Sequence, residues 1–230
     1  MNAPVKPLTA DRSTSLAAED LRVVIARTIN DLVQVATIRA LVYMGEQGCP
    51  FEEEFDGNDL CGATHLMLRR RDETIGVLRL RWFADFAKLE RLAIRKEYRG
   101  GPGLMILARA AFQLAERKGY RRLMGHAQPR LVAFWQRYFD GRVRPGRSPF
   151  SFSDYDYLEM EFELRPPADA ITIDADPFVL LRPEGDWDRP GILDRSAARH
   201  ANANRRQGPH VPGSPSQELN AAATGLSRPG

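Results

Sequence analysis

Three glycines, Gly100, Gly101 and Gly103, stand where a strand-like segment gives way to a helix-like one. Backbone N–H groups in such a turn lie at the positive end of the helix dipole, so they can bind an anion such as a diphosphate. The same glycines also suit a tight structural turn without a ligand. Two phosphate-binding patterns are absent, because no Gly-Lys-Ser/Thr follows and Gly103 has no third glycine three residues later. The cluster by itself leaves both interpretations open.

The segments around this cluster alternate between strand and helix patterns. Strand periods occur at 20–27, 64–70, 73–83, 88–95, 122–128 and 155–164. Apolar spacing predicts a helix that follows the glycines and ends with Gly119 as its C′ residue. A short helix is predicted at 130–139, and an earlier helix is predicted to start at Asn30 as its N-cap and to bury Val35, Ile38, Leu41 and Val42. The predicted order is β-α-β-β-β-α-β-α-β, without an internal repeat.

Composition limits the classes of function. The chain has 230 residues and is 43% hydrophobic, enough for one domain with a core and an extension. Its charge of +3 is the small difference between 33 basic and 30 acidic residues. No basic face with interleaved aromatic residues accompanies this charge, which argues against nucleic-acid binding. The two cysteines, Cys49 and Cys61, fit neither a zinc knuckle nor a CxxC redox pair.

The two ends differ in composition from the middle of the chain. Residues 1–18 are predicted to be flexible, and they lack the apolar run of a signal peptide. No apolar run is long enough to span a bilayer, so a cytoplasmic protein without membrane contact is expected. Residues 165–230 are rich in Pro, Gly, Asn, Ser and Arg and show no sustained period, which predicts a largely disordered tail. Within it, 171–193 could pack on the domain or bind a protein partner.

The span 88–123 resembles the central motif of the GNAT superfamily of acyl-CoA-dependent N-acyltransferases. In that family a tyrosine, an Arg or Gln and a glycine-containing turn open a helix that ends before Gly-Tyr. Tyr98, Arg99 and the segment "RKGYRRL" fit this motif without a gap. The segments "EQGCP", "EFDGND", "ATH" and "GVLRL", followed by "HAQ", "FW" and "EME", fall in the order found in small bacterial GNAT N-acetyltransferases.

This resemblance covers about residues 20–164, so the domain is placed at 19–164. It implies a mixed, mostly antiparallel sheet with flanking helices, in which one pair of parallel strands splays apart. It also implies acetyl-CoA as co-substrate, no metal, a small-molecule or protein amine as acceptor, and a homodimer as one possible assembly. The residues that the family would use to bind CoA correspond to Leu92, Ala93, Ile94, Arg99, Gly100, Gly101, Gly103 and Leu104.

The glycine turn departs from the family pattern at two positions. Pro102 stands at the first motif glycine and contributes no N–H to an anion, although its fixed φ suits the first turn of a helix. Leu104 stands where the family prefers a small residue. Gly100, Gly101 and Gly103 could shift the turn by one residue and restore the donors. The cofactor site is therefore kept, altered or lost.

The family mechanism needs a proton acceptor for the amine and a proton donor for the departing thiolate. Glu90 lies on the strand face of Leu92 and is the candidate base, with a structural ion pair to Arg79 or Lys88 as the alternative. The family's usual acid is a tyrosine at the position of Trp135, so Tyr138 is the substitute candidate. His126 could relay protons, or it could be a packed core residue.

Two further alternatives come from other features of the sequence. The acidic run Glu52, Glu53, Glu54, Asp56 and Asp59 is either a solvated loop or an attractor for a cationic amine. A similar segment occurs in GNAT-like enzymes that take long acyl chains from a carrier protein. In that case Arg69, Arg79 or Arg81 would lie near the carrier's phosphopantetheine. A domain that has lost catalysis and binds a protein through its tail is the remaining alternative.

Overall fold

The structure is a computed structural model that describes residues 21–206. The predictions for 1–18 and for the end of the tail beyond residue 206 lie outside the described residues. The chain divides into two compact units, one ending at Leu180 and one beginning at Leu181.

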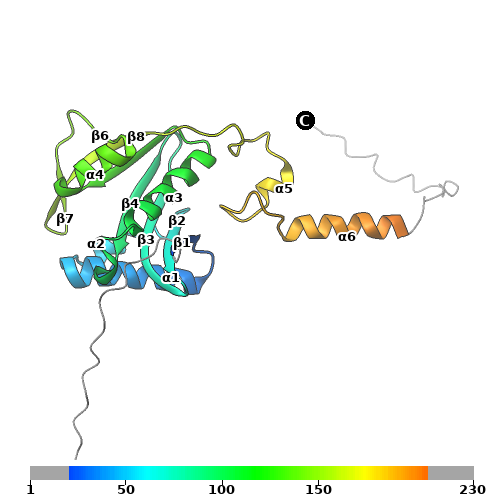
Figure 1. Cartoon of the computed structure of the whole chain (residues 1–230), viewed down its shortest axis with the longest axis horizontal. Helices are drawn as coiled ribbons and strands as arrows, with labels where there is room; N and C mark the ends of the chain where they lie inside the picture. The colour runs from blue at the N-terminus through cyan, green and yellow to red at the C-terminus, as the bar shows by residue number, and fades with distance from the viewer. Residues whose placement is uncertain (1–20, 207–230) are drawn as a thin grey trace, which may run out of the picture. The chain divides into compact units, whose positions relative to one another are not determined.

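One mixed sheet forms the centre of the first unit (Figure 1). Its strands follow the order β1-β2-β3-β4-β5-β8-β6, and β7 pairs with β8. Every pairing is antiparallel except β4 with β5, which is parallel. The predicted fold class is confirmed. The strands are β1 (Leu21–Ile25), β2 (Thr64–Arg70), β3 (Glu73–Trp82), β4 (Ala87–Ile94), β5 (Arg122–Ala127), β6 (Arg142–Val143), β7 (Phe150–Phe152) and β8 (Tyr155–Glu163).

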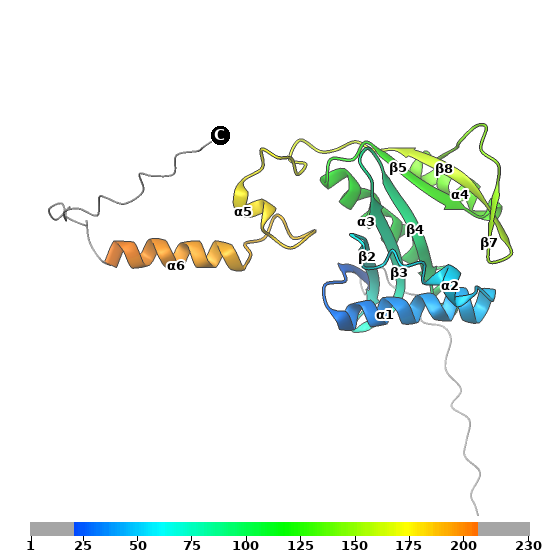
Figure 2. The same cartoon turned by 180° about the vertical axis from the view of Figure 1, so that it is seen from behind.

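Helices cover both faces of this sheet. The first helical segment packs on the face that carries Met67, Val77 and Ala93. The helix α3 packs on the opposite face, where Leu68 and its neighbours point (Figures 1 and 2). The helical elements of the first unit are α1 (Ile29–Arg39), the π-helix η2 (Ala40–Glu46), α2 (Phe51–Glu54), the 3-10 helix η3 (Lys96–Tyr98), α3 (Gly103–Arg117), α4 (Pro129–Phe139) and α5 (Pro177–Leu180).

The start of the first helix differs from its prediction. Thr28, not Asn30, is the N-cap, because its side chain accepts the Asp31 N–H while the Asp31 carboxylate accepts the Thr28 N–H. Leu41 is also not a core residue and is 52% exposed. The chain widens into the π-helix η2 at Ala40, which changes the angular spacing of the side chains that follow.

The strands β4 and β5 pair over only three residues each. Ala87, Lys88 and Leu89 face Leu123, Met124 and Gly125, and the two strands separate beyond this point. In β4 a bulge lies opposite Leu78, with Arg91 in the left-handed region at φ 52°. The implied splayed parallel pair is therefore present, and the wedge between the strands points toward α3 and α4.

The segment after Leu164 contains more structure than its composition predicts. Ile171 donates its N–H to the Arg117 carbonyl at 2.8 Å, and Arg165 donates its N–H to Glu116 Oε1 at 3.1 Å. These two bonds join the segment to the last turn of α3, within the first compact unit. In the second unit, α6 (Ile192–Arg206) is a helix that the sequence did not predict. Asp194 lies in the first turn of α6, and Arg182 contacts both of its carboxylate oxygens. These contacts lower the pKa of Asp194 to about 2.

Among residues 21–206, no helix combines the length and the apolar character that crossing a membrane requires.

Candidate active site

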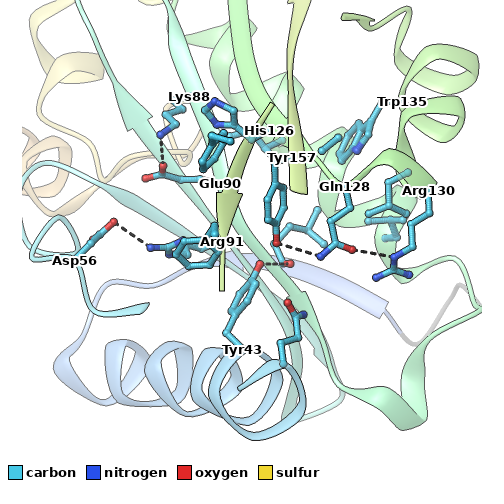
Figure 3. Close-up of a pocket in the computed structure, with 18 residues that line it drawn as sticks. Tyr43, Asp56, Lys88, Glu90, Arg91, His126, Gln128, Arg130, Trp135 and Tyr157 are labelled. Carbon is cyan, nitrogen blue, oxygen red and sulfur yellow. Dashed lines mark hydrogen bonds and ion pairs between the residues drawn. The ribbon is translucent and has the colours of Figure 1, made fainter. Parts of the chain in front are cut away.

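A cavity of about 300 Å³ opens where β4 and β5 separate (Figure 3). One wall carries charged residues of β4, and another carries aromatic residues of the β7–β8 hairpin. This wedge cavity is lined by Tyr43, Gln47, Asp56, Lys88, Leu89, Glu90, Arg91, Leu92, Leu104, His126, Ala127, Gln128, Arg130, Leu131, Trp135, Phe150, Phe152 and Tyr157.

A second cavity, of about 240 Å³, adjoins the glycine turn. It shares Gln47, Leu92, Leu104, Arg130 and Leu131 with the wedge cavity, so the two are neighbouring parts of one groove. The turn cavity also contains most of the residues predicted to bind CoA. Those residues are Leu92, Ala93, Ile94, Arg99, Gly100, Gly101 and Leu104.

Gly103, the remaining predicted residue, does not line either cavity. A Cβ atom there would lie 2.8 Å from Leu68 Cδ2 in the core, so Gly103 allows α3 to approach the sheet closely. Gly100 has a φ of 83°, which a glycine adopts without strain, and Pro102 is the N-cap of α3. The glycine cluster therefore serves packing at one position and a turn at another. The turn still borders a cavity at the start of α3.

Arg99 connects this turn to the end of β4 and to η2. Its Nε donates to the Ile94 carbonyl at 2.8 Å, and its guanidinium contacts the Glu46 carboxylate at 2.7 Å. The side chain is 42% exposed, so this ion pair can exchange with water or another anion. Two of the first N–H groups of α3 belong to Gly103 and Leu104, and no side chain caps them.

Glu90 lies on the charged wall of the wedge cavity. Its Oε1 accepts a hydrogen bond from Arg79 Nε at 2.8 Å, and its Oε2 lies 2.9 Å from Lys88 Nζ (Figure 3). Both predicted structural ion pairs are therefore present, and the carboxylate also borders the cavity. The structure thus leaves room for a catalytic role in addition to the structural one.

His126 and Tyr157 border the same cavity from β5 and β8. Burial, followed by the positive charge of Lys88, lowers the pKa of His126, so its ring is neutral at pH 7. Burial raises the pKa of Tyr157, so its phenol stays protonated. The Tyr157 oxygen accepts a hydrogen bond from Gln128 Nε2 at 3.1 Å, which leaves its own O–H to donate elsewhere (Figure 3). The sequence reasoning missed Tyr157.

The predicted acid, Tyr138, is not among the residues that line the two cavities. It is 51% exposed and contacts Phe134 and Arg137 on its own helix. Trp135, which stands at the family's tyrosine position, is buried against Phe162 while it borders the wedge cavity. The structure therefore does not bring Tyr138 together with Glu90.

The acidic run divides into exposed residues, Glu52 and Glu53, and residues that join an ion network, Glu54, Asp56 and Asp59. Glu54 is fully buried and pairs with Arg39 Nε, while Asp56 and Asp59 contact Arg79 Nη1 at 2.8 Å each. Burial opposes ionisation of Asp56, but its hydrogen bonds from Arg79 outweigh burial and lower its pKa. This network connects the loop after α2 to β3 and to Glu90.

The same network bears on the carrier-protein alternative. The Arg79 side chain is fully buried and occupied by three carboxylates, so it cannot meet a phosphopantetheine. Arg69 is paired with Asp31 at 3.0 Å. In residues 21–206, no group of three or more His, Cys, Asp or Glu side chains is arranged to hold a metal ion.

Comparisons with known proteins agree with this architecture. No profile of a protein family matches the chain. It is 28% identical over 109 residues to a Bacillus subtilis protein named as an acetyltransferase, covering 46% of this chain and 74% of that protein. It is 30% identical over 110 residues to Bacillus subtilis YyaT, with the same coverage. An acyl-CoA N-acyltransferase from Pseudomonas aeruginosa is 26% identical, with a TM-score of 0.57, covering 62% of this chain and 99% of that structure.

Proposed function

The chain belongs to the GNAT superfamily of N-acetyltransferases, and we propose that it transfers an acetyl group from acetyl-CoA to an amine. The groove with two adjoining cavities carries this proposal. One cavity adjoins the start of a helix, and the other contains titratable groups. Transfer of an acyl group from CoA requires a site for the diphosphate and a site for the acceptor, with the thioester between them.

The residues of the turn cavity suit the diphosphate end of CoA. Arg99 supplies a partly exposed guanidinium, and the uncapped start of α3 supplies backbone N–H donors. Binding would require Arg99 to exchange Glu46 for phosphate oxygens. The edge of β4 at Leu92, Ala93 and Ile94 borders the same cavity and can receive the pantetheine arm. When bound, acetyl-CoA supplies the activated acyl group.

The wedge cavity suits the acceptor amine. We assign Glu90 as the group that takes the amine's proton, with neutral His126 on the adjoining strand as a second acceptor. Tyr157 has the protonated phenol that a thiolate needs as it departs, and it replaces Tyr138 in that role. Mixed charges and aromatic rings line the cavity, which suits a small amine or a side chain of a protein.

A calorimetric titration with acetyl-CoA tests the diphosphate assignment. We expect binding in the micromolar range, about 7 to 8 kcal/mol. Arg99→Ala should lose most of this affinity, because it removes the cation that faces the diphosphate. Arg95→Ala is the control, since Arg95 carries an exposed ion pair of the same kind with Glu73 and does not line the turn cavity.

Unchanged affinity in Arg99→Ala would remove Arg99 from the diphosphate site. If the wild type binds neither acetyl-CoA nor longer acyl-CoAs, the acyltransferase proposal fails. Release of free thiol in a screen of amines with acetyl-CoA and longer acyl-CoAs identifies the acceptor class and the acyl length.

A further inference from the structure

Gln47 carries a buried hydrogen-bond acceptor with no partner. Its Oε1 atom is shielded from water and makes no hydrogen bond with any residue that the structure describes. Buried side-chain oxygens are normally satisfied, because an unpaired acceptor loses its hydrogen bonds to water without replacement. An exception inside a groove points to a donor that arrives with a ligand.

The place of Gln47 narrows the choice of that ligand. Gln47 is one of the few residues that line both cavities. A CoA molecule whose diphosphate lies in the turn cavity must pass this junction to bring its thioester to the wedge cavity. The part of CoA that passes there is the pantetheine arm, which contains two amide N–H donors.

The edge of β4 that can receive this arm offers one acceptor fewer than its sequence suggests. The Leu92 carbonyl already accepts a hydrogen bond from the Tyr43 hydroxyl at 2.7 Å (Figure 3). Burial raises the pKa of Tyr43, so this hydroxyl remains a donor. Gln47 lies four residues after Tyr43 and offers an acceptor that is still vacant. An amide oxygen is also neutral, so it can pair with an amide N–H without burying a charge.

The backbone holds Gln47 in place. Its N–H donates to the Met44 carbonyl at the end of η2, and its carbonyl accepts the Ser153 hydroxyl at 3.3 Å. Ser153 belongs to the turn between β7 and β8, whose strands form the aromatic wall of the wedge cavity. The backbone of Gln47 is thus fixed before a ligand arrives, which reduces the entropy lost on binding.

We propose that Gln47 Oε1 accepts an amide N–H of the pantetheine arm and so sets the depth at which the thioester enters the wedge cavity. This inference rests on the proposed function, because it assumes that CoA occupies the groove. Gln47 is therefore a binding and positioning residue for the donor, outside the glycine turn that the sequence singled out.

The test compares two ligands in the full-length protein. Gln47→Met keeps the shape of the side chain and removes the acceptor. Its affinity for CoA should fall about 5- to 10-fold, the effect of one lost hydrogen bond. Its affinity for adenosine 3′,5′-bisphosphate, which lacks the pantetheine arm, should stay the same. The midpoint of thermal unfolding should not fall, because the variant removes an unpaired buried group.

Gln34→Met is the matched control. Gln34 lies on α1, and its Oε1 accepts a hydrogen bond from the hydroxyl of Thr74 on β3 at 2.7 Å. Gln34 lines neither cavity. This variant should lower the unfolding midpoint and leave CoA affinity unchanged, the opposite result from Gln47→Met.

Each other outcome overturns the inference. If CoA binds Gln47→Met as tightly as the wild type, the pantetheine arm does not use Gln47, and acyl transfer itself remains supported. If both ligands weaken, or the unfolding midpoint falls, Gln47 has a structural role. If the wild type binds the bisphosphate but not CoA, or neither ligand, the proposed function fails together with the inference.

Discussion

At the scale of single residues, the wedge cavity gathers groups with different preferences for a proton. Glu90 is held by Arg79 and Lys88, His126 is kept neutral by burial and by Lys88, and Tyr157 is kept protonated by burial. Removal of a proton from an amine needs a proton acceptor, and the later protonation of a thiolate needs a proton donor. None of these groups is adjacent to another in the sequence.

Glu90→Gln should lower kcat by about 100-fold and leave the affinity for acetyl-CoA unchanged, because an amide cannot accept the amine's proton. The fold should persist, since Arg79 keeps Asp56 and Asp59 as partners. Steady-state kinetics with the best amine of the screen measures the effect. Glu163→Gln, at an exposed position of β8, is the control. Full activity in Glu90→Gln would leave Glu90 with a structural role only.

Tyr157→Phe should also lower kcat, by about 10- to 100-fold, because the phenyl ring fills the same space without a proton to donate. The control is Tyr155→Phe, which changes a tyrosine two residues earlier on β8 that lies outside both cavities. If Tyr157→Phe keeps its activity while Tyr138→Phe loses it, the acid assigned from the family pattern is the better one.

At the scale of the elements, β4 and the loop after α2 are held together through one arginine of β3. Arg79 is fully buried and contacts carboxylates from the loop and from β4. Because Glu90 of β4 lines the wedge cavity, the acidic segment helps to hold one wall of that cavity through Arg79. The bulge at Arg91 also shapes the wedge cavity. Glu90, Arg91 and Leu92 all border the cavity instead of alternating between the two faces of the sheet.

Arg79→Gln should lower the free energy of unfolding by roughly 3 to 5 kcal/mol, because it leaves buried carboxylates without their cation. Chemical denaturation measures this change. Arg81→Gln, two residues later on β3, should cost less than about 1 kcal/mol, since Arg81 is partly exposed and lies 3.9 Å from Glu90. Equal effects in the two variants would contradict the view that the Arg79 network stabilises the fold.

At the scale of the whole molecule, the chain divides into a first unit that contains the two cavities and a second unit with its own helix. The first unit continues beyond the end of the resemblance, because Arg165 and Ile171 donate their N–H groups to Glu116 and Arg117 in the last turn of α3. The segment was expected to be a tail because its composition lacks a period. Hydrogen bonds to a neighbouring helix require no period in the sequence.

A protein that ends at Leu180 should fold and bind acetyl-CoA like the full chain. A protein that ends at Leu164 should be less stable by roughly 1 to 3 kcal/mol, because it loses the bonds from Arg165 and Ile171 to α3. Thermal unfolding followed by circular dichroism compares the two. Equal stability would support the domain boundary at Leu164.

The strands that the sequence predicted are found in the structure because each carries a continuous or alternating apolar pattern. The helix α3 and its end at Gly119 follow for the same reason, since Gly119 has a φ of 85°. The two short strands β6 and β7 were not predicted, because segments of two or three residues show no period. The N-cap of α1 was predicted two residues late, although the pair Thr28 and Asp31 is readable as a capping box.

Some residues of the candidate site could be predicted from the sequence, and others could not. The residues predicted around the glycine turn lie together because they are close in the chain, and Gly103 is the exception because its neighbour Leu68 comes from another strand. Gln47 belongs to the EQGCP segment of the family resemblance but was given no role, and Tyr157 was not predicted as a site residue. The cavity that both residues line is formed by segments far apart in the chain. The ion pairs of Arg79 with Asp56 and Asp59 were not predicted, because charge in a sequence does not reveal burial.

Local patterns of the sequence were enough to predict the longer strands, the helix α3 and the place of the glycine turn, because these depend on periods and spacings within short stretches of chain. The superfamily was indicated by the resemblance of its motifs. The folded structure was needed to show which acids are buried, which tyrosine lines the wedge cavity and where an acceptor is left unpaired. Those properties depend on distances between segments far apart in the chain, and packing sets these distances.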